Sequence, residues 1–110
     1  MKKANLSLVR GDTMMFELKL HVDQAPESIN FSAASNNSGD YIFNKNLSDG
    51  IDLISLDESM KIYQVILNSD DTENAEIMDY MYDVRMSLNG DVFTLLAGTL
   101  TILPERKAFN

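Results

Sequence analysis

The stretch YMYDVRMSLNGDVFTLLAGTLTIL, residues 80–103, predicts two β-strands joined by a tight turn. In its first half, over 80–88, apolar and more polar residues alternate. A period of two is typical of a strand with one buried face. Asn89-Gly90 then favours a two-residue type I′ hairpin, because both residues tolerate positive φ. The second half ends in another alternating strand around Leu100 and Ile102.

The rest of the chain repeats this organisation. Alternation, or a β-branched and aromatic composition, predicts further strands at 5–10, 16–22, 28–34, 41–47, 51–56 and 61–67. Turn-forming residues separate these strands. Gly11-Asp12 follows the first strand, 24–27 and 35–40 are loops by composition, and Asp49-Gly50 favours a second type I′ hairpin.

Two segments depart from the alternation. Residues 69–76 combine N-cap residues with acidic ones, which favours one short helical turn near residues 70–76. We expect this turn to bridge two strands across the molecule. The apolar run 92–98 does not alternate, and a bulge or bend at Gly98 would explain it.

About eight short strands with regularly spaced turns are typical of a sandwich or barrel. We therefore expect an all-β fold, an immunoglobulin-like antiparallel sandwich of about 7–8 strands, with residues 1–110 forming a single domain. The chain has no cysteine, so it has no disulfide, no thiolate metal site and no cysteine nucleophile.

The charge and hydropathy of the sequence indicate where the protein is made and which classes of partner are not expected. No apolar run of roughly 7–15 residues follows Lys2-Lys3, so no signal peptide is predicted and synthesis in the cytoplasm is expected. No apolar run approaches the ~18 residues that span a membrane, so no membrane insertion is expected. The net charge is −8 and the basic residues are scattered. Such a surface repels a phosphate backbone, so nucleic acid is not an expected partner.

Several short motifs suggest chemistry, and each has a simpler structural interpretation. Arg10-Gly11-Asp12 spells an integrin-binding tripeptide, but a turn between two strands is the favoured interpretation. A group of acidic residues lacks the spacing of a calcium loop, so a solvated helix-capping turn is favoured there. This group comprises Asp70, Asp71, Glu73, Glu76 and Asp79. Asp57-Glu58 is likewise interpreted as a turn.

The remaining candidates are a histidine and a set of aromatic rings. His21 is the only histidine and falls on the polar face of its strand, where no motif ties it to a serine or a carboxylate. The tyrosines offer a possible sugar-binding platform, but most occupy positions that a core would use. They are Tyr41, Tyr63, Tyr80 and Tyr82. No catalytic, cofactor-binding or metal-binding residue is predicted.

Four groups of residues occur in an order that suggests a family. They are Val9-Arg10-Gly11-Asp12-Thr13-x-x-Phe16, Asp70-Asp71-Thr72, Tyr80-x-Tyr82-Asp83-Val84-Arg85, and Gly90-x-Val92-x-Thr94-Leu95-x-x-Gly98-x-Leu100-x-Ile102. Together they resemble the small immunoglobulin-like domain of tailed-phage and prophage tail or baseplate structural proteins, similar to the N-terminal domain of the upper baseplate protein. The resemblance covers nearly the whole chain. Asp79 departs from it, since the family often has glycine there.

The resemblance implies a non-enzymatic structural protein of a phage or prophage tail, located in the virion near the baseplate. Its expected partners are other tail or baseplate proteins, with a homo-oligomer also possible. Unpaired strand edges are a plausible means of docking. The alternative is a ligand-binding module that recognises a host-surface carbohydrate or receptor through exposed tyrosines and acidic loops.

Overall fold

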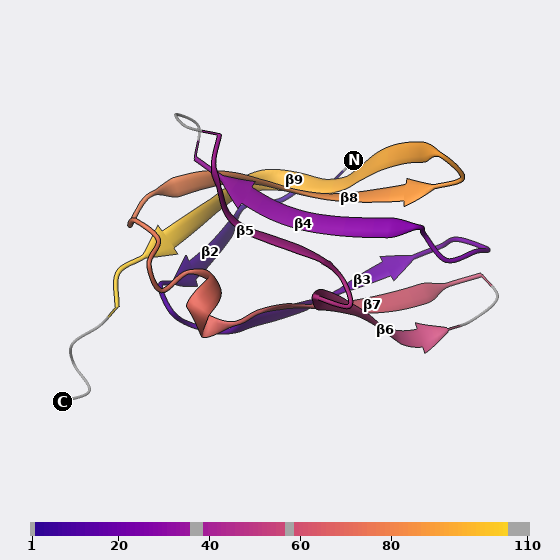
Figure 1. The fold of residues 1–110 in the computed structure, drawn as a ribbon, viewed down its shortest axis with the longest axis horizontal. Coiled ribbons are helices and arrows are strands. Elements are labelled where there is room, and N and C mark those ends of the chain that lie inside the picture. Colours follow the sequence, from indigo (N-terminus) through magenta and orange to yellow (C-terminus); the bar gives the residue numbers. More distant parts are fainter. Residues whose placement is uncertain (1, 36–38, 57–58, 106–110) are drawn as a thin grey trace.

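The chain folds as a curled β-sheet with one short helical turn (Figure 1). A computed structural model describes residues 2–35, 39–56 and 59–105. Within these ranges the strands are β1 (Lys2–Lys3), β2 (Leu6–Val9), β3 (Met14–Leu20), β4 (Ser28–Ala34), β5 (Tyr41–Leu47), β6 (Gly50–Leu56), β7 (Lys61–Leu67), β8 (Asp79–Leu88) and β9 (Asp91–Leu103), with a 3-10 turn, η1 (Ser69–Asp71), between β7 and β8. No helix in the described ranges is long and apolar enough to span a membrane.

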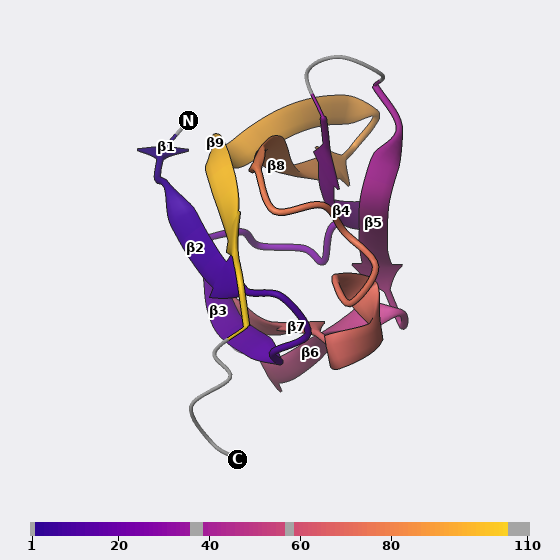
Figure 2. The same cartoon turned by 90° about the vertical axis from the view of Figure 1, so that its left-hand side faces the viewer.

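The strands are hydrogen-bonded in the order β1-β9-β8-β4-β5-β6-β7-β3, and β2 also pairs with β9. Figure 2 shows the sheet curled into two layers, with β9, β8 and β4 above and β3, β7 and β6 below. In an immunoglobulin fold, strands B, E and D form one sheet and C, F and G the other. The layers here have that order, with β3, β7 and β6 as B, E and D. The predicted fold class, an immunoglobulin-like all-β sandwich, is confirmed.

Strand number and direction differ in part from the prediction. The described chain has nine strands, because the short β1 also pairs with β9. Both N-terminal strands run parallel to β9, from Lys2 opposite Leu96 to Val9 opposite Leu103. The sandwich is therefore not wholly antiparallel. Polar Lys2-Lys3 carries no strand pattern of its own, so this pairing depends on a partner far along the chain.

One predicted hairpin is confirmed and the other is wrong. Asn89 and Gly90 have φ values of 54° and 82°, and Leu88 pairs with Asp91, as a type I′ hairpin requires. At the second site, positive φ occurs at Ser48 and Gly50 but not at Asp49. There β5 and β6 meet in parallel, since this turn carries the chain from one layer to the other instead of reversing it within a layer.

The bulge in β9 lies three residues before its predicted position. Val84 pairs with Leu96 and Arg85 with Thr94, which leaves Leu95 as the extra residue. Gly98 has a different role, because a Cβ at this position would overlap the backbone carbonyl of Ala4. A strand glycine often marks such a close approach of two backbones. The predicted helical turn is present but shorter, as the three residues of η1.

The core between the layers is organised around Phe31 of β4, which is fully buried. Three other rings meet it edge-on, Phe16 at 5.4 Å, Phe43 at 4.9 Å and Tyr82 at 5.8 Å between centroids. Edge-to-face pairs of this kind contribute beyond the area they bury. Phe16 belongs to the lower layer and the other rings to strands β4, β5 and β8, so the cluster joins the two layers without a disulfide.

Tyr80 forms the corner that leads into β8. Its hydroxyl donates a hydrogen bond of 2.9 Å to the carbonyl oxygen of Glu76. Immunoglobulin-like folds often carry a tyrosine near the start of strand F whose hydroxyl bonds to the backbone a few residues upstream. In antibody domains a cysteine follows two residues later. Here that residue is Tyr82, whose hydroxyl donates to the carbonyl of Ala4 at 2.6 Å.

Replacing Tyr80 with phenylalanine tests this corner. Tyr80→Phe keeps the buried ring and removes the hydroxyl that bonds to Glu76. We expect the free energy of unfolding, measured with urea, to fall by about 1 kcal/mol. Tyr63→Phe is the matched control, because its ring is also 3% exposed and its hydroxyl makes no hydrogen bond among the described residues. Equal losses in the two variants would contradict the role of this hydrogen bond.

Alkaline pH offers a second test of the core. Burial raises the pKa of Tyr63, Tyr80 and Tyr82 above the usual 10.0. The unfolded chain therefore releases these protons first as pH rises. Their contribution to stability is present below about pH 10 and lost above it. We expect the urea midpoint to fall steeply there, and ultraviolet absorbance to show these tyrosinates only as the chain unfolds. Reversible ionisation of all four tyrosines in the folded chain would contradict this.

Candidate functional site

The Arg10-Gly11-Asp12 tripeptide is a structural turn between β2 and β3. Gly11 has a φ of 83°, and its N–H donates to the hydroxyl of Thr72 at 3.0 Å. The guanidinium of Arg10 forms a 2.6 Å ion pair with Glu105. Their hydrogen bond also holds the pKa of the Glu105 carboxyl below 4.5. The turn interpretation is confirmed, and the arginine side chain is engaged within the molecule.

The acidic group from Asp70 to Asp79 is divided among separate contacts. Asp71 forms a 2.8 Å ion pair with Lys45, and Asp79 accepts a 2.6 Å hydrogen bond from the hydroxyl of Thr101. Across the described residues, no three carboxylate or imidazole side chains are grouped closely enough to hold a metal ion. Asp57-Glu58 lies outside the described residues.

His21 and three of the tyrosines do not form a site. His21 is exposed just after the end of β3. Tyr63, Tyr80 and Tyr82 are each only 3% exposed, so their assignment to the core is right. A platform of several exposed tyrosines is therefore not formed by them. Tyr41 differs, with 64% of its surface exposed.

A bulge in β5 explains the exposure of Tyr41. Ala33 pairs with Phe43 and Ala34 with Tyr41, so Ile42 is an extra residue on β5. Strict alternation would place Tyr41 on the same face as Phe43, which is buried. Bulges commonly redirect a side chain in this way. The sequence pattern 41–47 predicted the strand but gave no signal for the bulge.

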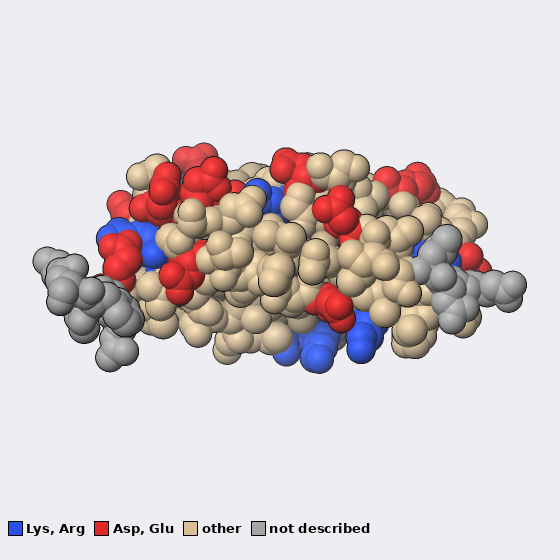
Figure 3. Space-filling model, turned by 90° about the horizontal axis from the view of Figure 1, so that it is seen from below, with Lys and Arg blue, Asp and Glu red and all other residues tan. Residues whose placement is uncertain are grey.

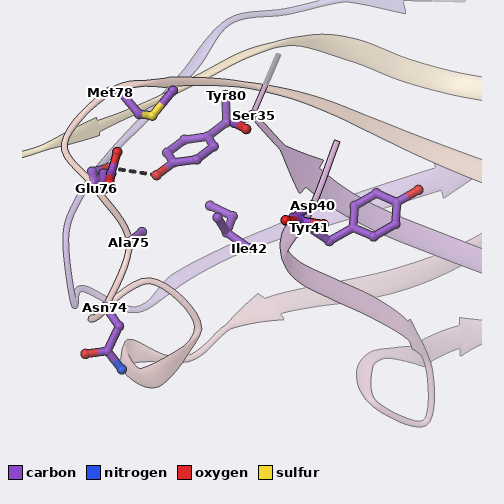
Figure 4. A pocket seen from close by; sticks show the side chains of 9 residues that line it. All are labelled: Ser35, Asp40, Tyr41, Ile42, Asn74, Ala75, Glu76, Met78 and Tyr80. Carbon is purple, nitrogen blue, oxygen red and sulfur yellow. Dashed lines mark hydrogen bonds between the residues drawn. The ribbon is translucent and has the colours of Figure 1, made fainter. Parts of the chain in front are cut away.

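Tyr41 lies at the rim of an open cleft of ≈400 Å³, between the start of β5 and the corner before β8 (Figure 4). Figure 4 shows the ring of Tyr41 directed away from the cleft and the hydroxyl of Tyr80 directed to Glu76. The cleft is lined by Ser35, Asp40, Tyr41, Ile42, Asn74, Ala75, Glu76, Met78 and Tyr80. Apolar side chains are thus flanked by carboxylate and amide groups. This arrangement suits the binding of a ligand through apolar contacts and hydrogen bonds.

The corner beside this cleft is fixed by residues that the sequence did not single out. Thr72 is fully buried and accepts the hydrogen bond from Gly11. Asp71 uses one carboxylate oxygen for Lys45 and the other for the backbone N–H of Asn68 at 2.7 Å. Lys45 occupies a buried position of β5 in line with Phe43. A lysine at an inward strand position is a signal for a buried partner, because lysine is rarely buried unpaired.

Part of β5 has an unpaired edge beside the cleft. β6 meets β5 only at Asn46 and Leu47, so residues 41–45 pair with β4 alone. Strand edges of this kind can pair with another chain. Tyr41 therefore combines an exposed ring with an open edge.

The ion pair of Lys45 allows a test of how the cleft is held. Lys45→Met leaves the part-buried carboxylate of Asp71 without its cation, and we expect the free energy of unfolding to fall by roughly 3 kcal/mol. The matched control is Arg85→Met, because Arg85 and Asp83 form an exposed pair at 3.8 Å. That change should alter stability by less than about 1 kcal/mol in the same urea titration. Similar losses in both variants would show that the buried pair does not fix the corner.

Comparisons with known proteins bear on the fold. No protein-family model and no curated protein sequence matches this chain. A family 123 glycoside hydrolase from Clostridium perfringens, solved in a study of glycolipid glycan hydrolysis, is similar in structure, with a TM-score of 0.58 and 12% identity. The match covers 96% of this chain and 23% of that enzyme, so this chain spans less than a quarter of its length and the likeness shows the fold alone. The Ig1 domain of mouse SynCAM 2 also matches, with 21% identity over 96% of each chain and a TM-score of 0.38. The immunoglobulin-like assignment rests on the strand order and not on that match.

Proposed function

We propose that this chain is a non-enzymatic docking domain of a phage or prophage tail, associated with the baseplate and acting through protein–protein contacts. The setting comes from the resemblance of the residue groups between Val9 and Ile102 to tail and baseplate domains. The mode of action comes from the surface of the sandwich. The two parts of the proposal are tested separately.

The observation that carries the docking role is the exposed edge of β5. Residues 41–45 have backbone groups on one side that no neighbouring strand occupies, and the exposed Tyr41 lies at the start of this edge. Tyrosine is among the residues that contribute most to binding at protein interfaces. A bulge that turns such a ring outward removes it from the core, which favours a binding role for Tyr41.

A second candidate function is recognition of a host-surface carbohydrate. The cleft beside Tyr41 places carboxylate and amide groups around apolar side chains, which also suits a sugar. The two candidates differ in their readout. Clear binding of one class of sugar on a glycan array, lost in Tyr41→Ser, would favour this alternative over docking.

The tail setting is tested by locating the protein in virus particles. The chain would be tagged in its native genome, and particles released after induction would be purified. We expect the tag in intact particles, and immuno-electron microscopy should place it at the tail end that carries the baseplate. Absence of the tagged chain from purified particles, while it accumulates folded in the cell, would overturn the tail assignment.

The docking surface is tested in the same particles. Tyr41→Ser should reduce incorporation by about tenfold, because truncating a central aromatic contact typically has an effect of this size or larger. Val92→Ser is the matched control, since Val92 is also 64% exposed and lies at the β8–β9 hairpin, away from Tyr41. Equal incorporation of both variants would exclude Tyr41 as a docking residue.

A further inference from the structure

The curled sheet does not close on itself. β1 and β3 stand at the two ends of the strand order, and β3 pairs only with β7. A groove of ≈390 Å³ lies between them, and its lining includes Lys2 of β1 and residues 16–20 of β3. We call this groove the seam. Within the described chain no strand fills it, so one edge of β3 keeps its backbone groups unpaired.

The seam has an apolar floor and two lysines. Phe16, Leu18 and Leu20 line it from β3, and Leu95 and Leu96 line it from β9. Leu95 is the extra residue of the β9 bulge, so the bulge helps to shape this floor. Lys2, Lys19 and Glu17 complete the lining, which gives it a positive balance in a chain of net charge −8.

The opposite side of the molecule carries acidic side chains, whose charge is opposite to that of the lysines in the seam. β5 and η1 lie on one side of the sandwich and β1 on the other, as Figure 2 shows. Two exposed carboxylates lie beside the start of β5, since Asp70 lines a hollow with Ile42 and Glu76 lines the cleft with Tyr41. In Figure 3 acidic side chains follow one long edge of the molecule, and a group of basic side chains lies at the opposite edge. Tyr41, which is exposed, lines the same cleft as Asp40 and Glu76 and so belongs to the acidic side.

We propose that copies of this chain associate side by side, with the β5 edge of one copy docked on the seam of the next. The ring of Tyr41 enters the apolar groove, and the carboxylates of Asp70 and Glu76 face Lys2 and Lys19. The occupant is a second copy because the same chain carries both the groove and the matching charged edge. This deepens the proposed docking function and rests on it, since it names the partner of the β5 edge.

The geometry of such a contact is heterologous, because two different surfaces meet. A pair joined in this way keeps one free β5 edge and one free seam, so association continues to a ring or a filament. The sides that carry these surfaces measure up to 49 × 32 Å, the face viewed in Figure 1. That area accommodates the roughly 800 Å² per partner of a standard interface.

Sedimentation of the wild-type chain over a concentration series is the first experiment. We expect the mean mass to rise with concentration at about 0.1 M salt and to fall back toward the monomer at about 1 M, where the Debye length shrinks from roughly 10 Å to 3 Å. A chain that stays monomeric at every concentration at the lower salt would overturn the proposal.

Mixing two variants is the decisive experiment. Tyr41→Ser with Glu76→Gln disables the β5 edge, and Lys2→Glu with Lys19→Glu disables the seam. Each double variant alone should associate at least about tenfold more weakly than the wild type. Their mixture should form a 1:1 heterodimer that grows no further, because one intact edge and one intact seam remain. Absence of that heterodimer, with both variants folded by circular dichroism, would overturn the heterologous contact.

Two control variants change the β8–β9 hairpin in the same ways. Val92→Ser removes an exposed apolar side chain, and Arg85→Glu reverses an exposed charge. Both should assemble as the wild type does, and an equal weakening in either would refute the assigned surfaces. The outcome is separable from the tail assignment. Assembly in solution without incorporation into particles would remove the tail setting and leave this contact. Incorporation of a strictly monomeric chain into particles would keep the tail setting and remove this contact.

Discussion

The packing of three rings against Phe31 is the interaction on which the rest of this structure depends. Phe16 comes from β3, Phe43 from β5 and Tyr82 from β8, so one buried ring contacts the side chains of three other strands. The chain has neither cysteine nor tryptophan. The two layers are therefore joined by apolar burial and ring geometry, where antibody domains use a disulfide packed on a tryptophan. Tyr82 occupies the place of one of those cysteines and adds a hydrogen bond to Ala4.

Much of the fold could be predicted from the sequence because its signals are local. Strands 28–34, 41–47 and 61–67 have the predicted bounds, since alternation or a β-branched and aromatic composition marks a strand locally. Asn89-Gly90 needs only its own φ preferences to form a hairpin. The errors occur where a distant partner decides. Gly98 is required by the carbonyl of Ala4, and the turn at Gly50 is set by the layer to which β6 belongs.

The candidate site was less predictable than the fold for the same reason. Tyr41 and Phe43 occupy equivalent positions in the alternating pattern, yet one is exposed and the other buried. The difference is the extra residue Ile42, which is visible only in the pairing with β4. The corner next to it is held by Thr72 and by the pair of Lys45 with Asp71. Only the buried lysine left a trace in the sequence.

The parallel pairing of β2 with β9 has a mechanical consequence. Leu6 to Val9 run beside Leu100 to Leu103 in the same direction. A force that pulls the two ends of the chain apart acts along these strands, so it loads their hydrogen bonds together instead of opening them one after another. Resistance to such a force is set by the rate of unfolding and not by equilibrium stability. The geometry of two short strands thus suits a part that transmits tension.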